Sequence, residues 1–170
     1  MKRSLIIALC CLSVLFAACN KEKPYEKFIG DYEGSGTING TMSLTIFGQT
    51  SSQEIKDMAV AMNVNLAPGD ADDKVILTYT NDDIQETYTT TGLITDKAVD
   101  FEPVTVNITM EGYSAEVTLD LAGNLVETIL SLNGTITGDG TVDYNGYPVP
   151  YTIDGTVTAN LNKIIVTPTN

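Results

Sequence analysis

The chain contains no histidine and no tryptophan, and only three of its 170 residues are cysteines. Without an imidazole, Ser-His-Asp and Cys-His catalysis, histidine-ligated haem and the common zinc sites are excluded. The three cysteines, Cys10, Cys11 and Cys19, all lie within the first 20 residues. A domain that follows them can form no internal disulfide, so its apolar core alone must stabilise it.

Basic residues are also scarce. Nine Lys and Arg residues stand against 22 Asp and Glu residues, which gives a formal charge of −13. An acidic surface repels nucleic acid phosphates and anionic lipid headgroups, so we expect neither as a partner. High solubility and a general affinity for cations are the simplest consequences of this charge.

The long apolar run of the sequence lies at its beginning. Lys2 and Arg3 precede an apolar stretch from Leu5 to Ala18, which leads directly to Cys19. This order is typical of a secretory signal peptide, and the stretch is shorter than the about 20 residues that a membrane-spanning helix needs. We expect residues 1–18 to be a signal peptide cleaved after Ala18. The remaining chain then carries seven basic and 22 acidic residues, a formal charge of −15.

The small residues Ala17 and Ala18 before Cys19 resemble the lipobox of bacterial lipoproteins, with Phe16 in place of the more usual leucine. The resemblance implies that Cys19 is lipidated and binds the chain to a lipid bilayer. Two or more acyl chains make a stable anchor, at about 0.8 kcal/mol per buried methylene. The alternative is an ordinary secreted protein in which Cys19 neighbours the cleavage site by chance.

The residues after the cysteine bear on localisation. Asn20 is not the aspartate that retains many lipoproteins at an inner membrane, so we expect the outer membrane of a cell envelope. Lys21-Glu22-Lys23 supplies only one acid to an export signal, which leaves the periplasmic and the surface-exposed side open. Residues 19–27 are expected to be the lipidated cysteine and a polar tether.

From Phe28 onward the apolar residues alternate with polar ones, and we assign residues 28–170 to one domain. Alternation with period two is typical of half-buried strands. The clearest examples are 42–46, 104–110, 113–121 and 151–161. Short strands separated by turn residues predict an all-β fold, an antiparallel β-barrel. A β-sandwich is the alternative.

Turn residues predict where the chain reverses. Asn39-Gly40 favours a tight hairpin, because both positions tolerate positive φ. Glu111-Gly112, Gly138-Asp139-Gly140 and Asn145-Gly146 predict further reversals, and residues 67–74 predict a longer hairpin loop.

Two segments have ambiguous patterns. Met58 to Leu66 alternates as a strand, but Ile55, Met58 and Met62 also fit a helical stripe, and Ser51 with Glu54 fits a capping box. We expect a strand from Met58 to Leu66 with a helical turn before it. Gly123 to Ile129 fits either a short helix or a strand interrupted by a bulge.

The opening Gly30-Asp31-Tyr32 resembles the Gly-x-Trp motif of lipocalins, with Tyr32 in the place of the tryptophan. Together with the lipobox and the segment from Tyr147 to Val157, it is similar to the calycin-like β-barrel lipoproteins of Bacteroidetes. The resemblance implies an antiparallel barrel of eight strands or slightly more, about eight to ten, and no established activity. The lipocalin analogy implies a cavity for a small apolar ligand.

The polar motifs favour solvated surface over catalysis. Asp70, Asp72 and Asp73 lack the spacing of an EF-hand loop, so we expect a hairpin tip. Weak calcium binding would need this tip to converge with the acidic turn at residues 81–83. Ser114 lacks the second glycine of a nucleophile elbow and any histidine base, and we expect it to face outward. We therefore expect no catalytic residues, no metal site and no cofactor.

The larger side chains offer two settings for a ligand. Four tyrosines fall near the later hairpins and could line a barrel mouth, although interior packing is the more ordinary role: Tyr113, Tyr144, Tyr147 and Tyr151. Four methionines could line an adaptable pocket or fill the core: Met42, Met58, Met62 and Met110.

We expect a non-enzymatic binding or accessory lipoprotein, with a small apolar or amphipathic molecule as its ligand. The alternative is a structural or protein-interaction module that contacts another envelope protein. A carboxylate-dependent hydrolase is a third hypothesis, because glycoside hydrolysis needs only two suitably spaced acids. A cavity of about 300 Å³ or more would favour the ligand, and a filled barrel would favour the module. The sequence does not fix the oligomeric state.

Overall fold

The computed structural model describes residues 23–81, 85–110, 113–144 and 146–165. A short 3₁₀ helix, η1 (Pro24–Lys27), precedes the strands. These are β1 (Gly30–Ile46), β2 (Gln49–Pro68), β3 (Lys74–Asn81), β4 (Glu86–Thr95), β5 (Ala98–Phe101), β6 (Val104–Met110), β7 (Tyr113–Val126), β8 (Ile129–Tyr144) and β9 (Tyr147–Lys163).

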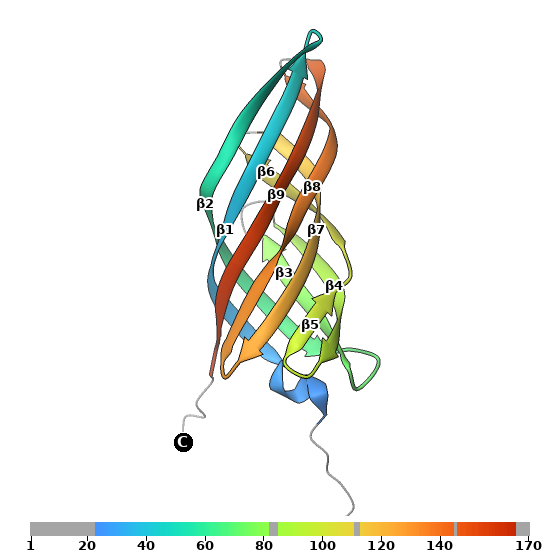
Figure 1. Cartoon of the computed structure of the whole chain (residues 1–170). Coiled ribbons are helices and arrows are strands. Elements are labelled where there is room, and N and C mark those ends of the chain that lie inside the picture. The colour runs from blue at the N-terminus through green and yellow to red at the C-terminus, as the bar shows by residue number, and fades with distance from the viewer. Residues whose placement is uncertain (1–22, 82–84, 111–112, 145, 166–170) are drawn as a thin grey trace, which may run out of the picture.

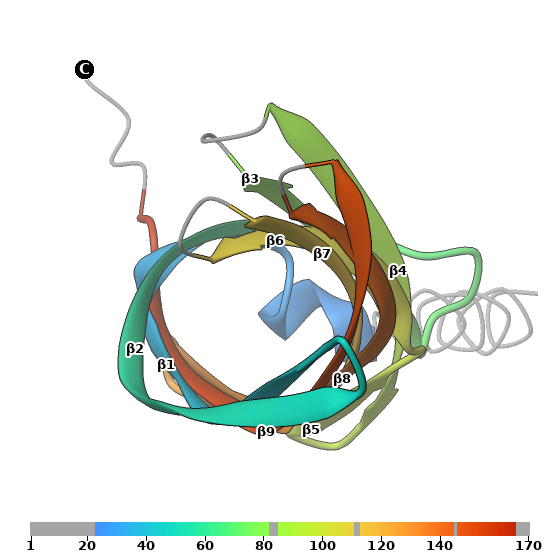
Figure 2. The ribbon, with the colours of Figure 1, turned by 90° about the horizontal axis from the view of Figure 1, so that it is seen from above.

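The strands form one antiparallel sheet in the order β5-β4-β3-β2-β1-β9-β8-β7-β6. β5 also pairs with β7, and this pairing closes the sheet into a ring. Figure 2 shows the ring from above. The predicted all-β antiparallel barrel is confirmed, its strand number falls within the predicted range, and the β-sandwich alternative is wrong.

β5 and β6 act as one interrupted strand along β7. Asp100 pairs with Ala122 and Val104 pairs with Leu119, so three residues of one strand face two residues of the other. The interruption falls at Pro103, which has no backbone N–H to donate to a sheet. Below it β4 pairs with β5, whereas above it β4 and β6 share no strand pairing among the described residues.

The helix η1 lies at the lower end of the barrel in Figure 1, and several of the most deeply buried side chains lie at the strand ends beside it. Phe28, Leu66, Leu130 and Leu161 are fully buried, and Tyr32 is 1% exposed. Burial of each such side chain stabilises the fold by about 1.5–3 kcal/mol. This end therefore contains the densest part of the core.

Tyr32 is the polar exception in this lower core. Its hydroxyl donates to the carbonyl oxygen of Phe28 at 2.8 Å, and the Lys163 ammonium lies 5.8 Å from the centre of its ring. Burial raises the pKa of Tyr32 to about 12, so the phenol stays neutral. Lys163 donates to the carbonyl oxygen of Lys27 at 3.0 Å, and its burial lowers its pKa. The last strand is thus tied to both η1 and the first strand.

Glycines on the inner face let neighbouring backbones approach closely. A Cβ atom on Gly34 would collide with the main chain of Asn160, and one on Gly134 would collide with the carbonyl of Asp120. Glycine is required wherever two backbones come this near. A larger residue at either position would therefore push the neighbouring strand away.

Two predicted reversals are wrong. Asn39-Gly40 lies inside β1, and the hairpin turn is Phe47-Gly48, with φ of 51° and 78°. Gly138-Asp139-Gly140 lies inside β8. In both places the glycine serves close strand packing and not chain reversal: a Cβ atom on Gly40 would lie 2.5 Å from the carbonyl oxygen of Asp154.

The predicted helical turn before Met58 is also wrong, because β2 is a strand from Gln49 onward. Its register with β1 shifts between Ile38 and Gly40, where two residues, Lys56 and Asp57, face one. Asp57 has a φ of 49°, and its N–H donates to the side chain of Asn39 at 2.8 Å. This bulge adds one residue between inward positions, which is why the segment also matched a helical stripe.

The remaining turns follow the sequence more closely. The hairpin loop predicted at residues 67–74 connects β2 to β3 and is one to two residues shorter at each end, because β2 ends at Pro68 and β3 begins at Lys74. Gly123 to Ile129 is neither a helix nor a bulge: β7 continues to Val126, and Glu127, with a φ of 57°, begins the turn into β8. Gly146 has a φ of 84° at the β8–β9 turn. Glu111, Gly112 and Asn145 lie outside the described residues.

Candidate functional site

The barrel encloses an apolar cavity of about 80 Å³. Aliphatic side chains from most of the strands line it, including Ile38, Met62, Leu77, Val106, Leu121 and Leu132. The rings of Tyr79 and Tyr88 cover one side, stacked with their centres 6.4 Å apart. The cavity is smaller than the roughly 300 Å³ at which pockets for drug-sized ligands begin. It suits a compact apolar molecule.

The buried polar groups in the lining already have partners. The Thr90 hydroxyl donates to the carbonyl oxygen of Glu102 at 2.6 Å. Among the described residues, no buried side-chain nitrogen or oxygen lacks a hydrogen bond. An incoming polar ligand would find no unpaired donor or acceptor to replace its lost water. The lining therefore favours hydrocarbon surface.

The cavity lies beside the seam where β4 and β6 separate. Continuing the β4–β5 register upward would place Glu86 opposite Asn107. Side chains make the contact there: the Asn107 N–H donates to the Tyr88 hydroxyl at 2.9 Å, and the Asn107 side-chain amide donates to Glu86 at 3.1 Å. Tyr88 in turn donates its hydroxyl proton to Glu86. A side-chain network thus replaces a backbone ladder next to the cavity.

The electrostatics of the seam follow from this network. Hydrogen bonds from Tyr88, and then from Asn107, lower the pKa of the Glu86 carboxyl, because they stabilise its charged form. Burial, reinforced by the hydrogen bond to Glu86, raises the pKa of Tyr88. The seam therefore pairs the charged carboxylate of Glu86 with the neutral phenol of Tyr88 across the physiological pH range.

A second separation lies on the other side of the β6–β7 hairpin. The pairing of β7 with β8 begins at Thr118 and Thr137, and above these residues β8 pairs only with β9 among the described residues. Tyr151 reaches from β9 past Gly140 of β8 and bonds the Glu116 backbone, accepting from its N–H at 2.9 Å and donating to its carbonyl at 2.8 Å. A polar groove of about 290 Å³ accompanies this separation.

The predicted tyrosine cluster is only partly visible. Tyr151 is buried, as the interior-packing role requires, and Tyr147 is 64% exposed. The side chains of Tyr113, Tyr144, Ser114 and Met110 lie outside what the structure describes. Met42, Met58 and Met62 pack against the core, and Met62 lines the cavity. No sequence pattern indicates Tyr88 or Asn107, because their pairing depends on where β4 leaves β6.

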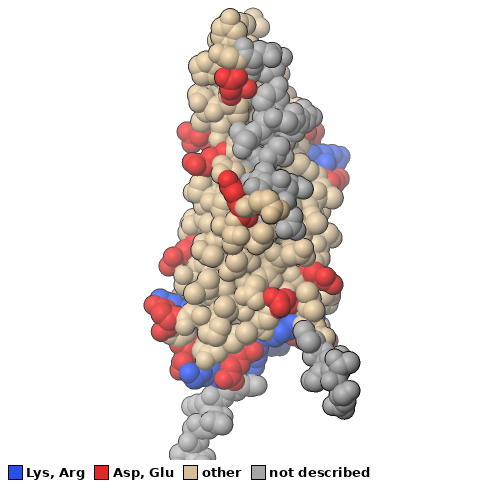
Figure 3. All heavy atoms as spheres, turned by 180° about the vertical axis from the view of Figure 1, so that it is seen from behind, with Lys and Arg blue, Asp and Glu red and all other residues tan. Residues whose placement is uncertain are grey.

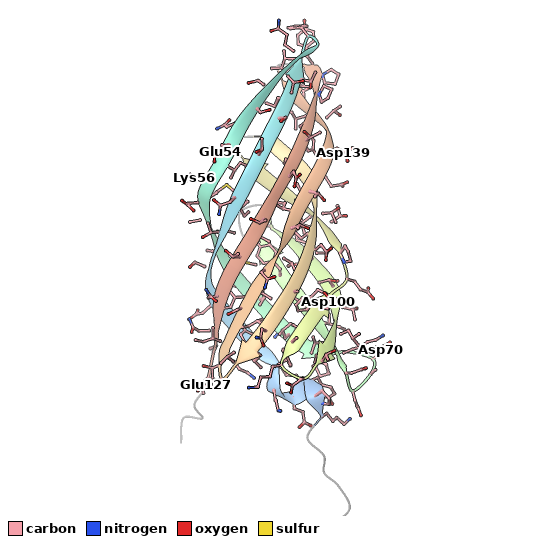
Figure 4. The ribbon with its side chains drawn as sticks, viewed as in Figure 1. Glu54, Lys56, Asp70, Asp100, Glu127 and Asp139 are labelled. Atoms are coloured by element: carbon pink, nitrogen blue, oxygen red, sulfur yellow. The ribbon has the colours of Figure 1, made fainter. Side chains whose placement is uncertain are left out.

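The acidic residues form no catalytic or metal site within the described ranges. Every described Asp and Glu is exposed, and no group of three potential ligands gathers there. Glu54, Asp100, Glu127 and Asp139 lie far apart on the barrel (Figure 4). On the face shown in Figure 3 the acidic side chains are scattered over the barrel. The described residues thus offer no facing pair of acids in a cleft for the hydrolase hypothesis.

The two acidic turns that weak calcium binding would need lie at opposite ends of β3. Asp70 lies at the lower end (Figure 4), and Asn81 ends the strand above it. Asp82 and Asp83 lie outside the described residues. Asp70 pairs with Lys74 at 3.2 Å, and Asp72 pairs with Lys23 at 3.0 Å.

We therefore expect millimolar calcium and magnesium to change the melting temperature equally, because both ions only screen the surface charge. Thermal unfolding followed by circular dichroism in each chloride salt measures this effect. A clearly larger shift with calcium would reveal a specific calcium site.

The anchor residues Ala18 and Cys19 lie outside the described residues. Within the part of the chain that is described, no helix combines the length and the apolar character that crossing a membrane requires.

Comparisons with known proteins assign the chain to no family. No protein-family model matches the chain, and no curated protein does. The solved structure of the ywiB protein from Bacillus subtilis matches with 11% identity and a TM-score of 0.27. The match covers 78% of this chain and 94% of that one. A TM-score this low carries no argument about fold or function.

Proposed function

We propose that this protein is a non-enzymatic, lipid-anchored accessory protein of the cell envelope whose barrel binds a small apolar molecule. The observation that carries the binding function is the apolar cavity beside the β4–β6 seam. Its lining is aliphatic and aromatic, its polar groups are satisfied, and it lies in the interior of a closed ring. Small barrels of about eight strands either fill with side chains or hold one small ligand.

The cavity sets the size of the ligand. At about 80 Å³, it is below the 150 Å³ of an engineered apolar cavity that binds benzene or xenon. We therefore propose a compact hydrocarbon group as the bound part. Half-buried apolar side chains continue along the inner face above the cavity, among them Met42, Leu44 and Met58. They offer further contact to an amphipathic molecule whose apolar end fills the cavity.

Anchoring and localisation rest on the sequence. Lys2, Arg3, the apolar stretch and Ala17-Ala18-Cys19 support a lipidated Cys19 at the start of the mature chain. Asn20 supports an outer membrane location, on its periplasmic or surface-exposed side. The calycin-like resemblance rests on the lipobox, on Gly30-Asp31-Tyr32 and on the segment from Tyr147 to Val157.

Xenon under pressure tests the cavity. We expect xenon to shift the methyl resonances of Val106, Leu121 and Leu132 in the purified full chain, because the gas binds dry apolar cavities. Val106→Leu adds a methylene to the cavity and is expected to reduce these shifts. Val126→Leu makes the same change at a side chain that is 53% exposed, and it should leave them intact. If xenon shifts no lining methyl group, the binding function is wrong.

A protein-interaction module is the second candidate, and two observations favour it. The cavity is too small for a drug-sized ligand. In addition, residues 49–63 of β2 pair only with β1 among the described residues, so one edge is free for a partner strand. Against this, the bulge at Lys56 and Asp57 and the charge of Glu54 are devices that discourage edge pairing. The ligand-binding function accounts for more of the interior.

A further inference from the structure

The upper part of the β6–β7 hairpin is attached to the barrel differently from every other part of the described wall. Residues 104–110 and 113–117, which we term the flap, pair with each other and with no third strand among the described residues. On one side β4 has separated from β6, and on the other side β8 has separated from β7. Residues 49–63 of β2 also lack a second neighbour among the described residues, but a long backbone ladder joins them to β1 and through it to β9.

Two tyrosine hydroxyl groups bridge the flap to the barrel at these separations. Tyr88 of β4 accepts from the N–H of Asn107 in β6 at 2.9 Å. Tyr151 of β9 bonds both the N–H and the carbonyl of Glu116 in β7, at 2.9 and 2.8 Å. Each hydroxyl takes the place of a neighbouring strand. A few side-chain hydrogen bonds are weaker in sum than a ladder, since each contributes modestly.

The inner face of the flap covers the apolar interior. Val106, Ala115 and Val117 are between 1% and 4% exposed, and Val104, Val106 and Asn107 line the cavity. Moving the flap outward would uncover the cavity without breaking the closed ring below, where β4, β5 and β7 stay paired. The break at Pro103 and the start of the β7–β8 ladder at Thr118 lie where the chain would bend.

We propose that the flap opens as a unit, that the hydroxyl groups of Tyr88 and Tyr151 hold it shut, and that its opening admits the apolar ligand to the cavity. The opening does not depend on the proposed function. Only the role of the flap in admitting the ligand rests on the proposed function.

Thiol labelling tests the opening. The experiment uses the full chain with Cys10, Cys11 and Cys19 replaced by serine, and Ala115→Cys as a reporter on the flap. Ala159→Cys is the matched reporter. The side chain of Ala159 is 4% exposed and that of Ala115 is 3% exposed, but Ala159 lies in β9, which is paired on both sides. A thiol reagent reacts with a buried cysteine only when its surroundings open. We expect the flap cysteine to react faster than the wall cysteine.

The role of the two tyrosine hydroxyl groups is tested in the same two cysteine variants. Tyr88→Phe and Tyr151→Phe each remove a hydroxyl and keep the ring, and we expect each to speed labelling of Ala115→Cys by about three- to tenfold. Labelling of Ala159→Cys should stay unchanged. Tyr32→Phe is the matched control, because its hydroxyl is also hydrogen-bonded to a backbone carbonyl but lies at the closed lower end. It should not speed flap labelling selectively.

The outcomes separate the two parts of the proposal. Equal labelling rates of the two cysteines in all variants would show that only global unfolding exposes the flap. The proposal that the flap opens as a unit would then be wrong. Xenon exchange, read from the line widths of lining methyl resonances, tests ligand access: Tyr151→Phe, at a residue that does not line the cavity, should raise entry and exit rates together and leave the binding constant unchanged. Faster labelling with unchanged xenon exchange would overturn the access route. Faster labelling without any xenon binding would overturn the proposed function and leave the flap standing.

Discussion

Replacing Tyr32 by alanine is expected to lower the free energy of unfolding by about 3–5 kcal/mol, as for other large aromatic side chains removed from a core. The ring is 1% exposed, the Lys163 ammonium lies over it, and the hydroxyl is bonded to Phe28. A domain of this size has a total stability of only about 5–15 kcal/mol. Urea denaturation followed by circular dichroism measures the loss as a shift in midpoint.

The matched control is Tyr147→Ala. It deletes the same atoms from a side chain that is 64% exposed, so we expect a change within about 0.5 kcal/mol. A comparable loss in both variants would mean that the lower closure is not the principal core of the barrel. Since no disulfide can form after Cys19, no covalent link compensates for the lost packing.

Replacing Cys19 by alanine is expected to move the protein from the membrane fraction to the soluble fraction almost completely. Without the cysteine thiol there is no site for the diacylglycerol, and the two or more acyl chains that make stable anchoring are lost. Cell fractionation followed by immunoblotting measures the distribution, and mass spectrometry of the purified protein detects the lipid.

Cys10→Ala provides the control, because it makes the same change nine residues earlier, within the apolar stretch. The protein should then remain in the membrane fraction. If Cys19→Ala also leaves the protein there, the lipid anchor is wrong and another contact must hold the chain at the membrane.

The architecture could be predicted from the sequence because alternation is a local property of the strands. Residues 113–121 and 151–161 alternate without interruption, and the structure contains both within β7 and β9. The strand number came from the resemblance to calycin-like lipoproteins and not from the alternation itself. Predicting the fold class therefore required no knowledge of which strands are neighbours.

Turns were harder to predict, because a glycine has more than one use. Asn39-Gly40 has the composition of a tight turn, yet Gly40 lies where β1 approaches β9 too closely for a side chain. The true turn begins with Phe47, an aromatic residue with positive φ that no turn preference would select. Only the long-range pairing of β1 with β2 and β9 distinguishes these uses.

The candidate site was beyond reach of sequence reasoning for a related reason. Tyr88 and Asn107 are 19 residues apart, and Tyr151 and Glu116 are 35 residues apart. Their contacts arise where one strand leaves its neighbour, which depends on the bulge at Pro103 and on strand lengths. The four tyrosines near the later hairpins pointed to Tyr151 but not to its partner.

Both described ends of the chain, η1 and the end of β9, lie at the closed end of the barrel (Figure 1). A lipid on Cys19 would therefore turn that end toward the bilayer and point the β1–β2 hairpin outward. The 17 residues of β1 extend over roughly 55 Å, and a strand tilt of about 40° reduces this reach to roughly 40 Å. Phe47, which is 94% exposed, would then be displayed at the tip of a stalk, far from the lipid headgroups.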